Sequence, residues 1–198
     1  MKSIVSMLAA VVLAIIVFFG FSFVQRNRLI QKDEAAQAAW GQVEATLQRR
    51  LDLIPNLVET VRGAAKYEGE TLVKITEGRN QVLGLARELG AAMEQRDTAK
   101  METIETGLVA SLRAFTGLAA EAYPALKAVD QFTMLQAELA GAENRVNVAR
   151  QRYNEAAAAL NTSVRQWNWL PFCRGIAPRE TFRAGPGAER APQVDLSK

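Results

Sequence analysis

The chain has 198 residues, one cysteine, no histidine and 49% hydrophobic residues, and its 24 basic and 21 acidic side chains leave a net charge of +3. One cysteine excludes an internal disulfide framework. The lack of histidine excludes a Ser-His-Asp or Cys-His nucleophile system, and with one cysteine it also excludes the usual Cys/His zinc site. The near balance of charge argues against a broad nucleic-acid-binding surface, and the length suits one ordinary domain.

The first 25 residues are expected to form a membrane anchor. The stretch from Ile4 to Val24 contains no charged residue and no proline, and at helical rise it spans about 31 Å, close to the hydrocarbon thickness of a bilayer. A cleaved signal peptide would have a shorter apolar core and a small-residue cleavage site, and a buried soluble helix would have a polar stripe. The sequence has neither and favours a single-pass anchor over both alternatives.

Basic residues flank this anchor on both sides. Lys2 and the α-amino group precede it, whereas Arg26, Arg28 and Lys32 follow it. Because basic residues near a span are retained on the cytoplasmic side, this count favours a cytoplasmic body. A cytosolic body would also keep Cys173 reduced.

Beyond the anchor, apolar residues recur at alternating steps of three and four, the period of an amphipathic helix. The clearest pattern runs from Phe132 to Leu160, and others run from Trp40 to Ala65, from Leu72 to Leu89 and from Met101 to Ala122. We call each such run of apolar residues a seam. The seams predict an all-α protein in which the N-terminal transmembrane helix continues into an antiparallel bundle of about four long helices.

Helix ends are predicted from residues with known terminal preferences. Gly69 can end the first body helix, Asp97 can cap the third, Pro124 stops the third, and Asp130 can cap the fourth. These signals divide the chain into an anchor (1–25), a helical body (26–168) and a Pro/Gly-rich tail (169–198) expected to be loop or disordered.

Pro55 lies inside the first body seam, where it removes one amide donor and frees the carbonyl of Leu51. The apolar phase continues through it, which predicts a kink and not a chain reversal. One interpretation of the polar residues around it is a charged interaction site; its members would be Arg50, Asp52, Pro55, Asn56 and Glu59. The sequence favours the alternative, in which the arginines are solvated and the polar groups satisfy a broken helix ladder.

A second polar stretch runs from Glu143 to Asn154. The side chains that could bind a phosphate or carboxylate are Asn144, Arg145, Asn147 and Arg150, with Glu143 and Asn154 beside them. They do not lie on the seam traced through the neighbouring alanines, which favours a solvated helix face. Arg150→Ala is therefore expected to cost under roughly 0.5 kcal/mol of unfolding free energy. Tyr153 lies on the seam, and its hydroxyl is therefore expected to find a partner or to reach the edge of the bundle.

The sequence gives little sign of catalysis. Paired carboxylates such as Glu102 and Glu105 give no sign of an acid and a base with separate roles. A Gly-rich phosphate loop and a Glu-x-x-His metal pair are both missing. We therefore expect a protein that is not an enzyme and that carries no cofactor.

Two blocks of the chain resemble the LemA family of bacterial membrane proteins. The first block reads Arg49-Arg50-x-Asp52-Leu53-Ile54-Pro55-Asn56-Leu57-Val58-Glu59-Thr60-Val61, with Glu68-x-Glu70-Thr71 after it. The second reads Tyr123-Pro124-x-Leu126-Lys127, then Phe132-x-x-Leu135-Gln136-x-Glu138-Leu139, then Glu143-Asn144-Arg145-Val146-x-x-Ala149-Arg150-x-x-Tyr153-Asn154. The resemblance runs from the anchor to about residue 165; after Ser163 the chain departs from the family's usual Phe-Pro ending.

The resemblance implies a single-pass protein of the bacterial inner membrane with a helical-bundle body and no assigned catalysis. Relatives are associated with envelope stress, membrane-bound proteases and, in one case, formation of an intracellular membrane organelle. Together with the long neutral bundle, the resemblance indicates a non-catalytic scaffold or adaptor. Its expected partners are the lipid bilayer and either a membrane protein or a second copy of this chain. The alternative is a ligand-binding or enzymatic module with a polar pocket near Pro55.

Two geometric expectations follow from the helix lengths. The first and fourth body helices are expected over residues 26–66 and 130–168. They should pair antiparallel with residue numbers summing to about 194, which places Trp40 near Tyr153. The fourth helix would then return to the membrane, with Trp167, Trp169 and Phe172 level with Arg26 and Arg28 at the headgroups. The alternative is that these rings close the bundle end or pack on a partner.

Overall fold

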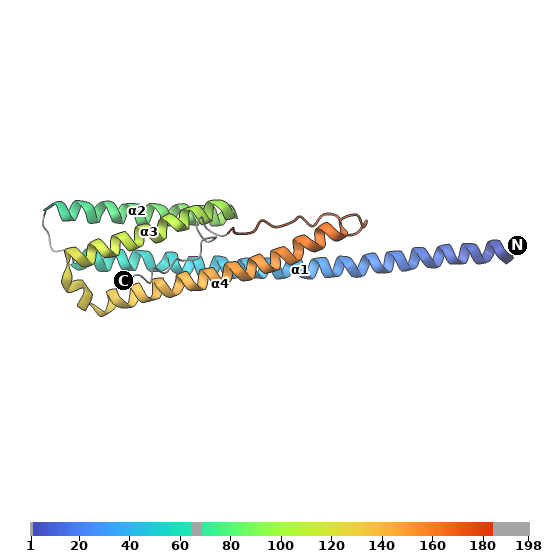
Figure 1. Ribbon diagram of the computed structural model, residues 1–198, viewed down its shortest axis with the longest axis horizontal. Helices are drawn as coiled ribbons and strands as arrows, with labels where there is room; N and C mark the ends of the chain where they lie inside the picture. Colours follow the sequence, from blue (N-terminus) through green and yellow to red (C-terminus); the bar gives the residue numbers. More distant parts are fainter. Residues whose placement is uncertain (1, 65–68, 184–198) are drawn as a thin grey trace, which may run out of the picture. The chain divides into compact units, whose positions relative to one another are not determined.

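The computed structural model describes residues 2–64 and 69–183, and every regular element within them is helical. The elements in chain order are α1 (Lys2–Ala64), α2 (Gly69–Glu94), α3 (Thr98–Ala122), the short 3-10 helix η1 (Pro124–Ala128) and α4 (Asp130–Trp167) (Figure 1). The predicted all-α fold, with an apolar N-terminal helix and a following helical bundle, is confirmed.

Most predicted helix ends are confirmed. The Asp97 carboxylate caps α3 by accepting the Lys100 backbone N–H at 2.9 Å. Pro124 opens η1 directly after α3 ends, and Asp130 is the first residue of α4. The turn expected at residues 67–69 lies outside the described residues, except for Gly69, which begins α2.

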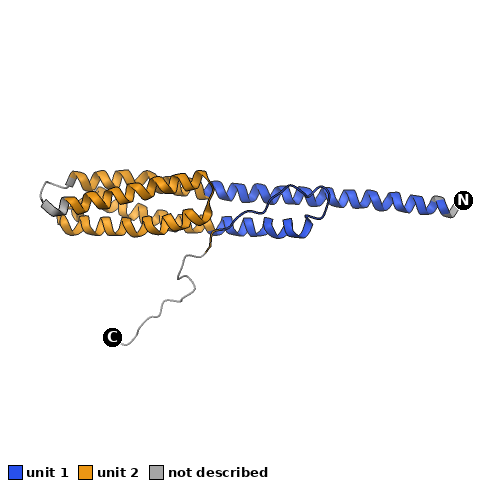
Figure 2. Cartoon of the chain, turned by 90° about the horizontal axis from the view of Figure 1, so that it is seen from above, with its two compact units in different colours: residues 1–42, 151–181 blue, residues 43–150, 182–198 orange. Residues whose placement is uncertain are grey.

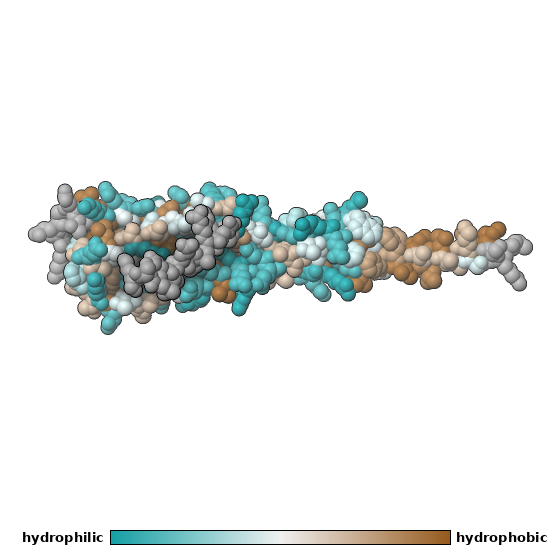
Figure 3. Space-filling model, in the orientation of Figure 1, coloured by the Kyte–Doolittle hydropathy of each residue, from teal (hydrophilic) through white to brown (hydrophobic). Residues whose placement is uncertain are grey.

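The expected anchor and first body helix are one continuous helix, α1, which runs through Pro55 without a chain reversal. It is the one helix among the described residues that is long and apolar enough to cross a membrane. Figure 3 shows hydrophobic surface along its N-terminal part. From Ile4 to Val24 the large hydrophobic side chains that the structure describes are between 39% and 71% exposed.

The chain divides into two compact units (Figure 2). Unit 1 comprises Met1–Gln42 and Gln151–Thr181, and unit 2 comprises Val43–Arg150 and Phe182–Lys198. Parts of all four helices belong to unit 2, whereas unit 1 contains only parts of α1 and α4 together with the chain that follows α4.

The core of unit 2 is formed by the seams that the sequence predicts. Its largest fully buried side chains, from all four helices and η1, are Val43, Leu47, Ile54, Leu57, Leu89, Met101, Leu108, Leu126 and Phe132. Because each helix contributes a row spaced by three and four, the rows interdigitate around one interior, as in helical bundles generally.

The core of unit 1 joins α1, α4 and the chain after α4. It contains Leu29, Ala36, Leu160, Val164, Leu170 and Cys173. The Trp40 and Tyr153 rings meet edge to face with centroids 5.1 Å apart, which confirms the predicted antiparallel register of α1 and α4.

The chain after α4 has two parts. Residues 168–175, the turn segment, form successive turns, and residues 176–183, the extended segment, have no regular structure. The Asn161 amide donates to the Arg179 carbonyl at 2.8 Å, and its oxygen accepts the Arg179 N–H at 2.7 Å. Arg179 also pairs with Asp33 of α1 at 2.8 Å. The first part of the expected tail is thus held against both helices of unit 1, while residues 184–198 lie outside the described residues.

Candidate functional site

Three buried charged side chains meet inside unit 2 and form what we call the charge cluster. Arg50 of α1 donates from Nη1 to Glu105 Oε1 of α3 at 2.9 Å, and Arg150 of α4 pairs with Glu105 Oε2. The side chains of Arg50, Glu105 and Arg150 are only 3%, 7% and 15% exposed. The expectation that Arg50 and Arg150 are solvated is therefore wrong.

The reason for this error is helix phase. Arg50 follows Leu47 by three residues and precedes Ile54 by four, and all three are buried. Arg150 follows buried Val146 by four residues and precedes buried Tyr153 by three, so both arginines occupy seam positions. Ala149 is buried too, and a seam traced through it leaves Arg150 apparently on the outside.

Burial sets the electrostatics of the charge cluster. Desolvation raises the pKa of Glu105 above its usual 4.5, and the charges of Arg150 and Arg50 oppose this shift only in part. Desolvation likewise lowers the pKa of Arg150, with Glu105 opposing it. The Arg150 guanidinium lies 4.6 Å from the centre of the Phe182 ring, a cation–π contact within unit 2. The Nε atoms of Arg50 and Arg150 have no hydrogen-bond partner in the described part of the chain.

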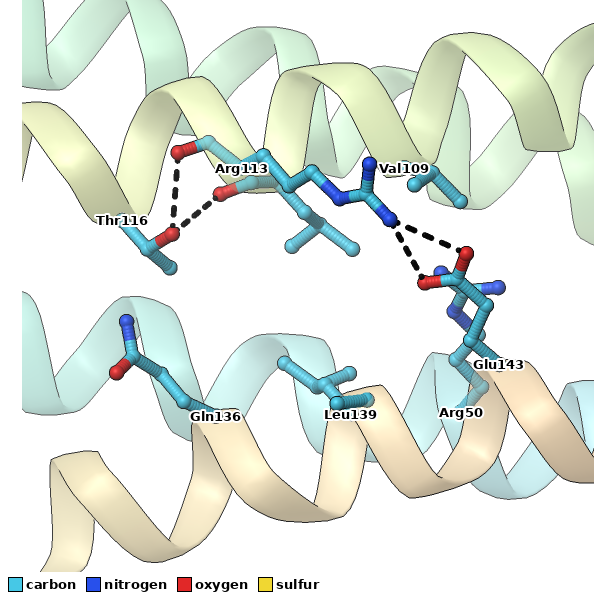
Figure 4. A pocket seen from close by; sticks show the side chains of 9 residues that line it. Arg50, Val109, Arg113, Thr116, Gln136, Leu139 and Glu143 are labelled. Atoms are coloured by element: carbon cyan, nitrogen blue, oxygen red, sulfur yellow. Dashed lines mark hydrogen bonds and ion pairs between the residues drawn. The ribbon is translucent and has the colours of Figure 1, made fainter. Parts of the chain in front are cut away.

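A small pocket of about 170 Å³ opens beside the charge cluster (Figure 4). Its polar lining comes from Arg50, Arg113, Thr116, Gln136 and Glu143. Arg113 Nη2 lies 3.3 Å from Glu143 Oε1, and the Thr116 hydroxyl donates to carbonyls of its own helix. Most polar groups of this pocket therefore already have partners within the chain, and among the described residues no group of His, Cys, Asp and Glu could hold a metal ion.

The candidate residues around Pro55 do not join Arg50. Asp52, Pro55, Asn56 and Glu59 are exposed on α1. Their polar groups make local contacts: Asp52 accepts from Gln48, the Asn56 carbonyl accepts the Thr60 hydroxyl, and Glu59 pairs with Arg62. A hollow of about 490 Å³ lies here; its lining residues are Asn56, Glu59, Thr60, Gly63, Val129 and Gln131.

The candidates on α4 are also separated. Glu143 belongs to the pocket, Asn144 is exposed, and Asn154 is half-buried. The Tyr153 hydroxyl donates to the Glu180 carbonyl at 2.8 Å, which confirms that it finds a partner. Glu105, which joins Arg50 and Arg150, was not among the candidate site residues predicted from the sequence.

A second distinctive group, in unit 1, is an aromatic cluster between α1 and the chain around the end of α4. Trp167 meets Phe21 at 5.5 Å between ring centroids, Phe172 meets Phe19 at 5.6 Å, and Trp169 meets Phe18 at 6.5 Å. Phe18, Phe19 and Phe21 belong to the uncharged stretch Ile4 to Val24.

Residues 39–196 match the model of the LemA family. This match covers the charge cluster, the pocket and the turn segment, and it includes most of the chain. The chain belongs to the LemA family.

Relatives of this LemA-family chain include two magnetosome proteins of Paramagnetospirillum magneticum, MamQ 1 and MamQ 2. Each is 28% identical over 195 residues, which cover 90% of this chain and 72% of the relative. The protein LemA of Metamycoplasma hominis is 23% identical over 154 residues, which cover 77% of this chain and 65% of the relative. Family and relatives are consistent with a membrane-associated helical protein.

Proposed function

We propose that this LemA-family protein is a single-pass, membrane-anchored scaffold or adaptor that organises the bacterial envelope through protein–protein contacts. The observation that carries the proposal is α1. Its large hydrophobic side chains from Ile4 to Val24 are exposed, and the same helix then supplies buried seam residues such as Leu29 and Leu47. Exposed apolar surface on this scale needs a nonpolar environment, and a bilayer matches its length.

The interior of unit 2 supports a role without catalysis. The charge cluster uses its carboxylate on its own arginines, and in the pocket beside it Glu143 pairs with Arg113 and the Thr116 hydroxyl donates within its own helix. An activated nucleophile or an acid–base pair needs such groups within reach of a substrate. Buried charge of this kind instead fits a device that specifies how helices pair.

We place the body on the cytoplasmic side of the inner membrane, as the basic residues after the anchor favour. The test uses a Cys173→Ser background with Gln95→Cys as the reporter, because Gln95 is exposed at the end of α2. A membrane-impermeant maleimide should label this cysteine only after the cells are permeabilised. Labelling of intact spheroplasts would place the body outside.

The adaptor role is tested by photocrosslinking in native membranes. A crosslinking amino acid is introduced at Met134 or Val148, which are 56% and 48% exposed on α4, and at the exposed Lys100 of α3 for comparison. We expect a discrete adduct with a membrane protein or a second copy from one helix face and not from the other. The proposal fails if no exposed face of unit 2 forms an adduct.

The hollow beside Pro55 supports the alternative of a ligand-binding or enzymatic module. Melting of the full chain in mild detergent is followed across a panel of metabolites. A shift that Asn56→Ala abolishes and Asn144→Ala leaves unchanged would favour this alternative, since both asparagines are exposed but only Asn56 lines the hollow. We expect no such shift.

A further inference from the structure

The turn segment lies against the part of α1 that contains no charge. Through their ring contacts, Trp169 and Phe172 are beside Phe18 and Phe19, inside the stretch that ends at Val24. Phe18 precedes Arg26 by about 12 Å along the helix at 1.5 Å per residue. If the apolar part of α1 is in a bilayer, side chains at this level are below its headgroups.

The buried face of α1 extends into the same stretch. Ser22, Gln25 and Leu29 are buried at successive steps of three and four, which continue the seam of unit 1 toward the N-terminus. The Ser22 hydroxyl donates to the Phe18 carbonyl at 2.8 Å, so this polar group is satisfied within the helix. The packing of unit 1 thus continues N-terminal to Arg26, the first charged residue after the apolar stretch.

Part of the backbone of the turn segment is satisfied by its own turns. The N–H groups of Asn168, Leu170 and Cys173 donate to the carbonyls of Val164, Trp167 and Leu170 at 2.9, 3.0 and 3.1 Å. Pro171 has no N–H to satisfy. Because unpaired backbone groups are strongly disfavoured in hydrocarbon, these bonds lower the cost of placing the turns at the boundary between headgroups and acyl chains, where water can reach the remaining groups.

The side chains of the turn segment divide into a buried set and an exposed set. Leu170 and Cys173 are buried in the core of unit 1, whereas Trp169 and Phe172 are 62% and 40% exposed. Tryptophan and phenylalanine are large apolar groups, and the indole N–H of tryptophan suits the boundary between headgroups and acyl chains.

Exposed arginines lie near these aromatic residues in the sequence. Arg26 and Arg28 follow the apolar stretch of α1, Arg165 precedes the turn segment, and Arg174 lies within it. No acidic residue occurs between Gln25 and Gln31 or between Val164 and Pro178. This uniform positive charge is complementary to anionic lipid headgroups.

We propose that the turn segment is a second membrane-contacting element. Trp167, Trp169 and Phe172 occupy the boundary between headgroups and acyl chains beside α1, and the four arginines contact anionic headgroups. The inference rests on the proposed anchoring of α1, and it adds a second point of attachment that is distant in sequence from the first.

The depth of Trp169 provides the test. The full chain is reconstituted into phosphatidylglycerol/phosphatidylcholine liposomes with Trp169 or Trp40 as its single tryptophan, the others being changed to phenylalanine. Trp40 is the matched control, because it is buried against Tyr153 beyond the charged residues that follow the apolar stretch. Lipids brominated near the start of the acyl chain should quench Trp169 at least several-fold more than Trp40.

Flotation of the liposomes separates the two proposals. Protein that does not float contradicts the anchoring of α1. Protein that floats with Trp169 quenched no more than Trp40 overturns only the second attachment. Trp169 that is unquenched by lipid and also shielded from aqueous iodide would assign this face to a protein contact and would overturn the lipid assignment.

The arginines are tested separately by the lipid that the purified protein retains. Mass spectrometry of the detergent-solubilised full chain counts bound phosphatidylglycerol molecules. Arg165→Gln with Arg174→Gln should reduce this number several-fold, and Arg152→Gln, an exposed arginine elsewhere on α4, should not. Equal retention by the two variants would overturn the role of the arginines.

Discussion

Both units of this protein are built on α1 and α4, but the structure that covers this pair of helices differs between them. In unit 2, α2 and α3 cover α1 and α4, and the interior also holds a charge cluster. Unit 1 has no further helix, and non-helical chain takes the position instead, through buried Leu170 and Cys173 and the two hydrogen bonds of Asn161. A pair of helices can thus be completed without another helix, provided that side chains satisfy the backbone of the covering segment.

The largest expected effect is in unit 2. Glu105→Ala removes the carboxylate that pairs with Arg50 and Arg150 and is expected to cost about 3–5 kcal/mol of unfolding free energy, as the loss of one member of a buried ion pair does. Arg150→Ala leaves Glu105 with Arg50 and should cost about 1.5–3 kcal/mol. Denaturant unfolding of the full chain in mild detergent, followed by far-ultraviolet circular dichroism, measures both.

The control for these variants is Arg113→Ala, which removes an ion-pairing arginine that is 74% exposed. A solvated pair contributes under about 1 kcal/mol. If Glu105→Ala were no more costly than Arg113→Ala, the charge cluster would not be a structural element.

Matched leucine substitutions compare the two cores. Leu108 in unit 2 and Leu160 in unit 1 are both fully buried. We expect Leu108→Ala to cost about 3–5 kcal/mol and Leu160→Ala about 2–3 kcal/mol, because the cost of a cavity falls where the surroundings can collapse into it. Fluorescence isolates unit 1, because all three tryptophans, Trp40, Trp167 and Trp169, belong to it. Equal losses would mean that non-helical chain packs as stiffly as a helix.

A smaller effect is expected from releasing the extended segment. Asn161→Ala removes both hydrogen bonds to Arg179 and should cost about 1–2 kcal/mol. Amide hydrogen exchange at Arg179 should become faster while exchange in α3 does not change. Thr162→Ala is the control, because the Thr162 hydroxyl bonds only within its own helix; an equal effect of the two changes would contradict a specific role for Asn161.

The smallest effect is a dependence on pH. Since the pKa of Glu105 is raised on folding, the folded state binds this proton more readily than the unfolded state. As pH falls through the raised pKa toward 4.5, the wild type should therefore gain stability relative to Glu105→Gln, which keeps an acceptor oxygen but cannot titrate. Unfolding free energies of both proteins at several pH values measure the difference, and a wild type that loses stability relative to this variant over that range would contradict the direction of the shift.

The helices, their caps and the register of α1 with α4 could be predicted from sequence because they depend on local signals and on helix length. The charge cluster could not be predicted in the same way. Each of its members is at a seam position beside an apolar residue, as Glu105 is beside Ile104, and a seam can be traced through either neighbour. The spacing Met101, Glu105, Leu108, Leu112 alternates four and three as well as the apolar spacing does. Only the packing of the four helices decides between these phases.

The packing of the chain after α4 could not be predicted from the sequence either. Prolines and the end of helical periodicity correctly predict irregular structure over residues 176–183. They carry no information about the contacts that order it, such as Arg179 with Asp33, because these join residues far apart in the chain.

The long separation between these partners has a consequence for biosynthesis. Lys32 bonds to Ser163 across 131 residues and Asp33 to Arg179 across 146. This part of α1 therefore gains its partners only when almost the last described residues have been synthesised. At roughly 5–20 residues per second, the ribosome needs about 7–30 s to supply them. Once Arg150 has been made, unit 2 has the sequence of its four helices, while Leu29, Ala36 and Trp40 of the nascent chain still lack their partners. A stalled or truncated product would therefore display the unpaired face of unit 1 to chaperones and proteases, and a completed chain would not.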